Sequence, residues 1–297
     1  MGKHLPKPPF KLSVISDEVS QDLEVVAKFA YRHELDGIEL RTVWNLPPQR
    51  LVTRISDIKR ILSEYGLKVS AIASPFFKSN IDNEEEYKEH IEILRNCIKL
   101  AKAVDTDIIR GFTFWRRGKY ESFVEKILEK FNEPLEIVEA EGIILAIENE
   151  PATFVTNGRL LADFLSRISS RNVRAVWDPG NDIWDPYNEV PYPDGYEFVK
   201  EFIVHVHVKD GVRCGTEGKP EARPIGEGDV DYRGQIAALI RDGFKGYISL
   251  ETHWRPKAKL SEELIVRPGG QEFSAMGEEA SEICINKLKK IIGEVTR

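Results

Sequence analysis

The sequence predicts a single closed (β/α)8 barrel, the TIM-barrel fold, with its active site at the carboxyl ends of the strands. Eight strand-like runs alternate with helix-like segments across 297 residues, and no change of composition marks a linker. Strict alternation predicts a parallel sheet, and eight units in a chain of this length favour a closed barrel over an open doubly wound sheet. No GxGxxG motif follows the first run, which argues against a dinucleotide-binding sheet. We therefore expect one domain over 1–297, with 1–9 as a loose lead-in.

The first four units follow from apolar periodicity. Strands are predicted at 10–16, 38–41, 67–74 and 107–112, and helices around 23–30, 55–62, 84–104 and from about 120. Ser20 is the expected cap of the first helix. Pro134 is expected to kink or split the fourth helix, because proline lacks the amide donor and clashes with the preceding turn.

The last four units repeat the pattern. Strands are predicted at 143–148, 173–178, 203–207 and 247–251, and helices around 160–168, 196–201 and 236–240 and after Met276. A segment rich in glycine, proline and charge, 209–231, is expected to be a loop. Glycines stand just before the second, third, fifth and eighth strands, as helix C-terminal caps should.

Four of the predicted strands end on potential metal ligands, namely Glu148, Asp178, His207 and Glu251. Side chains alternate faces along a strand, so in parallel neighbours that face one interior these four converge at the same end. Three carboxylates and one imidazole suit a single hard or borderline divalent ion such as Mn²⁺, Mg²⁺, Co²⁺ or Zn²⁺. No cysteine belongs to the set, which argues against a structural zinc.

Composition narrows the class of protein. The net charge of −7 argues against a nucleic-acid binder, because phosphate contacts usually come from a basic surface. Three widely spaced cysteines suggest neither a disulfide framework nor a zinc knuckle, so we expect a reducing cytoplasm. The amino-terminal residues hold no apolar run long enough for a signal peptide or a membrane span.

Five segments, LAIENEP, VWDPGN, HVHVKD, RPIGEGDVDY and GYISLETHW, resemble the xylose isomerase-like TIM-barrel superfamily. They are most similar to its sugar phosphate isomerase/epimerase group, which includes inosose dehydratases and ketose 3-epimerases. The resemblance implies that Glu148, Asp178, His207 and Glu251 bind one divalent metal and that Arg223 binds substrate. Many relatives have a histidine three residues after the strand-six aspartate. Here that position is Asn181, which can bind a hydroxyl but is a poor metal ligand.

The resulting hypothesis is a metal-dependent sugar or sugar-phosphate isomerase or epimerase. Glu148 and Glu251 are the expected acid and base, exchanging a proton next to a carbonyl through an enediolate that the metal holds. Lys209 and Arg223 are candidates to bind substrate hydroxyls or a phosphate, and Asn181 a hydroxyl. Trp184 reads equally as pocket wall or core filler. His205 reads as a hydrogen-bonded interior residue or as a substrate contact.

Three alternatives remain open at the level of the sequence. An inosose-type dehydratase would share the metal and the first proton abstraction, so the product would distinguish it. An endonuclease IV-like phosphodiesterase uses a three-metal cluster with several extra histidines. Of the six histidines here, His33 and His90 lie in predicted helices and His4 in the lead-in, which leaves too few. A non-catalytic sugar-binding barrel would not need an intact ligand set. The expected partner is a small carbohydrate, with neither nucleic acid nor membrane, and a homo-oligomer is plausible because relatives associate.

Overall fold

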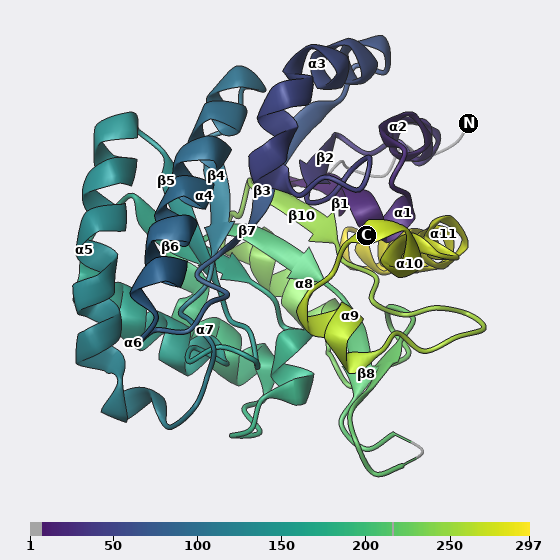
Figure 1. Cartoon of the computed structure of the whole chain (residues 1–297). Helices are drawn as coiled ribbons and strands as arrows, with labels where there is room; N and C mark the ends of the chain where they lie inside the picture. Colours follow the sequence, from purple (N-terminus) through teal and green to yellow (C-terminus); the bar gives the residue numbers. More distant parts are fainter. Residues whose placement is uncertain (1–7, 216) are drawn as a thin grey trace, which may run out of the picture.

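A computed structural model describes residues 8–215 and 217–297. Eight parallel strands close into a barrel in the order β1-β10-β7-β6-β5-β4-β3-β2, as predicted (Figure 1). The barrel strands are β1 Lys11–Ile15, β2 Gly37–Leu40, β3 Lys68–Phe76, β4 Ile108–Gly111, β5 Ile144–Glu148, β6 Val173–Trp177, β7 Ile203–Val208 and β10 Tyr247–Leu250. Each lies within a residue or two of its predicted run.

Helices lie outside the strands and bury an apolar stripe against them, which is the packing expected of alternating units (Figure 1). They are α1 Ser16–Val19, α2 Leu23–Arg32, α3 Ile55–Glu64, α4 Glu84–Ala103, α5 Val124–Glu141, α6 Gly158–Ile168, α7 Tyr196–Val199, α8 Tyr232–Arg241, α9 Glu262–Val266, α10 Gly270–Ser274 and α11 Gly277–Val295. Short turns of 3₁₀ helix include η3, Asn181–Trp184. In the described part of the chain, no helix has both the length and the apolar character needed to cross a membrane.

The structure corrects two expectations about helices. The cap of α2 is Asp22, whose carboxylate accepts a hydrogen bond from the amide of Glu24. Ser20 lies two residues earlier, where its hydroxyl accepts a hydrogen bond from the amide of Asp22. Helix α5 continues through Pro134 without splitting. The carbonyl of Lys130, which would bond an amide at position 134, instead accepts a hydrogen bond from the hydroxyl of Tyr87 at 3.2 Å.

The expected loop 209–231 is partly a hairpin. Strands β8, Asp210–Val212, and β9, Glu221–Arg223, pair antiparallel with Asp210 opposite Arg223. The carboxylate of Asp210 accepts from the amides of Gly226 and Gly228 at 2.8 and 3.0 Å, so the predicted glycine turn folds around one side chain. Residues 1–7 of the predicted lead-in lie outside the described residues.

Strand register carries the ligand candidates to one end of the barrel. Glu148 pairs with Val176, two residues before Asp178. His207 pairs with Ser249, two residues before Glu251. Because the strands are parallel and side chains repeat every second residue, these partners share a face and a direction. The carboxyl end of the barrel therefore collects all four.

Candidate metal centre

The four predicted ligands meet. Glu148, Asp178, His207 and Glu251 each offer one ligand atom, and these atoms lie within 4.8 Å of one another. Nδ1 of His207 is 3.1 Å from Oε1 of Glu148 and 3.6 Å from Oε2 of Glu251. All four side chains are buried. A common ion could touch all of them after small inward movements, because metal–ligand distances of about 2.0–2.2 Å put opposite donors about 4 Å apart.

Basic side chains contact these carboxylates. The ammonium of Lys209 is 2.6 Å from Asp178 and 2.6 Å from Glu251. Arg110 contacts Glu148 at 3.1 Å, and Arg41 contacts Glu251 at 2.5 Å. Each of these bases is itself buried, so the ion pairs are hardly screened by solvent.

The charges in this network do not balance. Its ion pairs join five carboxylates, namely Asp17, Glu18, Glu148, Asp178 and Glu251, to four basic side chains, namely Arg41, Arg110, Lys209 and Arg255. A sixth carboxylate, Glu39, contacts the imidazoles of His205 and His207. Buried charge is costly unless it is compensated. With the imidazoles neutral, as a metal-bound His207 would be, the network carries an excess of two negative charges. Without a metal ion, burial would lower the pKa of His207, but Glu39 and Glu148 raise it well above its usual range, so a proton on this imidazole offsets one of the two. One divalent cation would neutralise the full excess, so both the donor set and the charge fit a single ion.

Titration of the two glutamates favours binding of a cation, whereas the carboxylates around His207 raise the pKa of its imidazole despite burial, so a metal ion would have to displace that proton. Burial alone would raise the pKa of Glu148, but the imidazole of His207 and the guanidinium of Arg110 lower it to about 2. Burial likewise opposes ionisation of Glu251, yet Lys209 and the histidines hold its pKa well below the usual range. Burial raises the pKa of Asp178 to about 7 against the pull of Lys209. The two glutamates therefore present charged oxygens at neutral pH.

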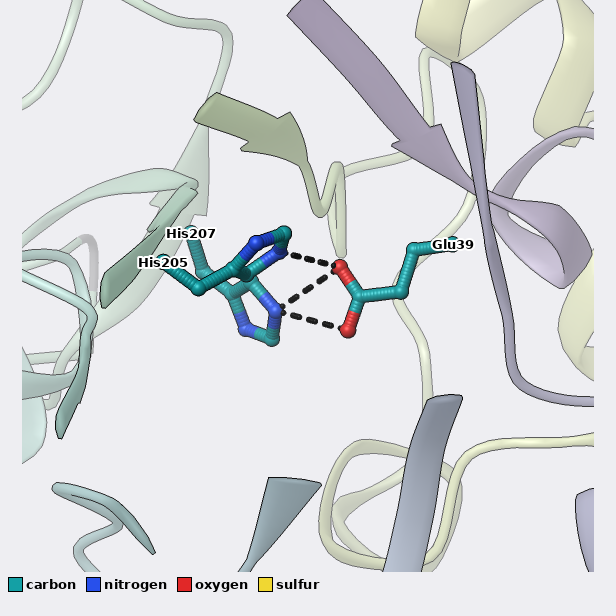
Figure 2. A group of neighbouring side chains, drawn as sticks. All are labelled: Glu39, His205 and His207. Atoms are coloured by element: carbon teal, nitrogen blue, oxygen red, sulfur yellow. Dashed lines mark hydrogen bonds and ion pairs between the residues drawn. The ribbon is translucent and has the colours of Figure 1, made fainter. Parts of the chain in front are cut away.

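A buried triad orients the histidine ligand (Figure 2). The carboxylate of Glu39, from β2, accepts hydrogen bonds from Nε2 of His207 at 3.0 Å and from Nε2 of His205 at 2.8 Å. With Nε2 engaged, Nδ1 of His207 is the nitrogen that faces Glu148. His205, predicted as an interior residue or a substrate contact, lies on Glu39, and its Nδ1 has no hydrogen-bond partner within the described residues.

The remaining predicted residues divide into two groups. Asn181 donates to Glu148 at 3.2 Å and to the carbonyl of Asn149 at 2.7 Å, so with Lys209 it adjoins the ligands. Trp184 is half-buried and packs against the backbone of Gly211. Arg223 pairs with Glu221 at 3.0 Å in the hairpin. Over the described residues, no hydrogen bond or ion pair joins Arg223 to the four ligands.

Sequence reasoning left out several residues of the site. Arg41, Glu39 and Arg110 are recognisable as polar strand ends, but nothing in their spacing assigns them a role. Asn149 hydrogen-bonds the backbone on both sides of Asp178, accepting from its amide at 3.0 Å and donating to its carbonyl at 2.8 Å. His253, two residues beyond Glu251, reaches to 3.5 Å from it.

A cavity of about 240 Å³ lies beside the centre, and Arg41 and Arg110, which contact Glu251 and Glu148, form part of its wall. Its outer wall is Val266–Pro268, from the segment that follows β10. A second cavity of about 340 Å³ lies at the opposite end of the barrel, beside the starts of β7 and β10 at Ile203 and Gly246. Only the first adjoins the ligands.

Residues 27–269 match the family described as "Xylose isomerase-like TIM barrel". A search of curated proteins finds no match. Among solved structures, the chain is similar to the IOLI protein with a bound zinc atom, with 18% identity, a TM-score of 0.73 and coverage of 96% of this chain and 99% of that one. It is also similar to D-psicose 3-epimerase from Clostridium cellulolyticum H10, with 13% identity, a TM-score of 0.71 and coverage of 95% and 99%. A third is the probable 3-DHS dehydratase AsbF from Bacillus anthracis, with 18% identity, a TM-score of 0.69 and coverage of 94% and 98%.

Proposed function

Since the chain belongs to the xylose isomerase-like TIM barrel family, we propose that it is a divalent-metal-dependent isomerase or epimerase of a sugar or sugar phosphate. The observation that carries this proposal is the convergence of Glu148, Asp178, His207 and Glu251, whose ligand atoms lie within 4.8 Å of one another. Solved structures with the same fold include a D-psicose 3-epimerase and a D-tagatose 3-epimerase-like protein.

The residues of the site would have different roles, according to where they lie. A divalent ion bound here would polarise a substrate carbonyl and offset the negative charge that develops when the neighbouring proton leaves. Asp178 and His207 would hold the ion, since the Lys209 ammonium fixes Asp178 and Glu39 fixes the imidazole. Asn181 and Lys209, both next to the ligands, would meet substrate hydroxyls. Trp184, Arg223 and His205 remain predicted substrate contacts.

Proton transfer would fall to Glu148 and Glu251. Nη1 of Arg110 lies 3.1 Å from Glu148 and 3.9 Å from Glu251, so one guanidinium steadies both carboxylates. They arrive from β5 and from the end of β10. One can remove the proton next to the carbonyl while the other returns it to the same carbon from the opposite side or to the neighbouring carbon.

The first prediction tests these two residues. In a screen of ketoses and ketose phosphates with Mn²⁺ in deuterated water, the protein should exchange the substrate's α-proton, and EDTA should abolish the exchange. Glu148→Gln and Glu251→Gln should each lower the exchange rate by about 10²–10⁴-fold, because a positioned acid or base contributes that much. Exposed Glu201→Gln is the matched control. Wild-type turnover in a variant that combines Glu148→Gln with Glu251→Gln would refute the proposal.

A dehydratase is the second candidate function, and the position of Lys209 beside Asp178 and Glu251 supports it. Its ammonium touches Asp178 and Glu251 at 2.6 Å, and both contacts raise its pKa although burial would lower it. A protonated amine beside the reacting carbon could protonate a departing hydroxyl. Mass spectrometry of the product separates the two reactions, because elimination removes one water and isomerisation conserves mass.

A further inference from the structure

The charged side chains around the cavity beside the metal centre share one sign. They are Arg41, Lys78, Arg110 and Arg267, and none of the described residues that line the cavity is acidic. The carboxylates that partner these bases do not belong to the wall. The remaining wall is mainly proline and apolar side chains, Trp115 among them. A small cavity with cationic edges and apolar walls is suited to a negatively charged ligand.

Arg41 is already committed within the protein. Its guanidinium contacts Asp17 at 2.7 Å, Glu18 at 2.9 Å and Glu251 at 2.5 Å. Arg110 has weaker contacts. Besides Glu148 at 3.1 Å, its guanidinium lies 3.9 Å from Glu251 and 3.5 Å from the carbonyls of Ser74 and Ala73. A guanidinium has five N–H donors, so Arg110 retains donors for a ligand.

Lys78 and Arg267 provide the other free donors. Nζ of Lys78 contacts Glu150 and the carbonyl of Val266, both at 2.8 Å, which leaves one of its three protons. The guanidinium of Arg267 lies 5.3 Å from the ring centre of Trp115 and has no carboxylate or carbonyl partner within the described residues. Burial lowers the pKa of Lys78 against the pull of Glu150, as expected of an ammonium with too few anions around it.

We propose that this cavity binds an anionic group of the substrate, a phosphate or a carboxylate, between Lys78, Arg110 and Arg267. The assignment deepens the proposed function and rests on it. Arg110 touches both the cavity and Glu148, so a ligand held by its anionic end would present its carbonyl end to the metal centre one side chain away. The volume of about 240 Å³ is below the range of roughly 300–1,000 Å³ typical for drug-sized ligands, which limits the occupant to monosaccharide size.

Calorimetry with simple anions tests this assignment without knowledge of the sugar. Inorganic phosphate and propionate are titrated separately into the Mn²⁺-loaded full-length protein, and into Arg267→Gln and Lys78→Gln variants. Arg267 is exposed, so its substitution leaves the fold intact, and a glutamine in place of Lys78 can still donate to Glu150. Each variant should bind the preferred anion about tenfold more weakly, the effect of losing one charge-assisted hydrogen bond.

Arg171→Gln, an exposed arginine just before β6, is the matched control and should bind as wild type does. Binding of phosphate alone identifies a phosphorylated substrate, and binding of propionate alone identifies a sugar acid. Anion affinity that is the same in wild type and both variants, including affinity too weak to detect, overturns the assignment. The proposed function fails on a separate observation, α-proton exchange that survives EDTA, so the two failures are distinguishable.

Discussion

The carboxylate of Glu39 accepts hydrogen bonds from the Nε2 atoms of His205 and His207 (Figure 2). Because Nε2 of His207 is engaged in this way, Nδ1 is the nitrogen that faces the metal centre. Carboxylates behind a metal-ligating imidazole fix its ring and raise its basicity. Glu39→Gln should therefore weaken Mn²⁺ binding by about 10–100-fold. Calorimetric titration of the metal-free protein measures the loss directly and does not depend on turnover.

Ser13→Ala, a small change in the neighbouring strand β1, is the control for general disturbance of the barrel interior. If Glu39 only fills space, Glu39→Gln and the control will bind Mn²⁺ alike. A wild-type stoichiometry of two ions that falls to one in Glu39→Gln would instead show that Glu39, His205 and His207 hold an ion of their own, and the positioning role would be wrong.

His90 gives a pH prediction at a site away from the metal ligands. Its Nδ1 accepts the amide of Phe77 at 2.8 Å, and burial lowers its pKa to about 4. The unfolded chain, with a pKa of about 6.5, binds the proton first, so stability is complete above pH 6.5 and falls as the pH drops towards 4. From pH 7 to 5 this group should remove about 2 kcal/mol from the free energy of unfolding.

Urea denaturation at both pH values measures this loss. His90→Asn keeps an acceptor for the Phe77 amide but cannot titrate, so its stability should change less between pH 7 and 5. Equal pH dependence in wild type and variant would show that His90 is not the group responsible.

Alternation of side chains along predicted strands was enough to predict that Glu148, Asp178, His207 and Glu251 converge, because each stands at the end of a strand and parity fixes its face. The same rule could not assign roles to Glu39, Arg41 or Arg110. Their partners lie in other strands, up to 210 residues away in the case of Arg41 and Glu251, and depend on register and side-chain length. The position of Arg223 could not be predicted for a different reason. It pairs with Glu221 in a hairpin, where the sequence predicted a loop.

The bounds of helices and strands with strong apolar periodicity were predictable almost to the residue. The conformation of irregular segments could not be predicted, because it depends on contacts made by single side chains. The turn after β9 is held by Asp210, whose carboxylate accepts the amides of Gly226 and Gly228. A Cβ at Gly228 would lie 2.0 Å from that carboxylate. The reason for a glycine at position 228 is therefore visible only once Asp210 is placed beside it, whereas Gly226 adopts a positive φ of 80°.

Asp210→Ala should free this turn while the barrel persists. It removes acceptors from at least two amides, and each buried unsatisfied donor costs about 1–3 kcal/mol. Limited proteolysis between 212 and 228 should accelerate by at least about tenfold, with the circular dichroism spectrum unchanged. Asp194→Ala, at an exposed position outside this segment, is the comparison. Equal cleavage of the two variants would show that Asp210 does not organise the turn.

Across the whole molecule, the barrel concentrates more buried negative than positive charge at one end. When the imidazoles are neutral, as metal binding to His207 requires, six carboxylates face four basic side chains there, and the barrel cannot relieve the excess by exposing them without opening its mouth. A cation that binds only the folded chain should stabilise it through mass action, by about 4 kcal/mol at roughly a thousand times the dissociation constant.

Removal of metal should therefore lower the melting temperature. For a chain of this size, about 4 kcal/mol corresponds to a shift on the order of 10 °C between EDTA-treated and Mn²⁺-saturated protein in differential scanning calorimetry. Above the Asp178 pKa of about 7, for example at pH 8.5, Asp178→Asn removes one ligand and one of the excess charges, so the metal-free variant should melt higher than metal-free wild type and gain less from Mn²⁺. Exposed Asp194→Asn should behave as wild type in both conditions. Coincident melting curves with and without Mn²⁺ would mean that the excess charge is relieved by protons rather than by a cation, and the metal centre would lose its physical basis.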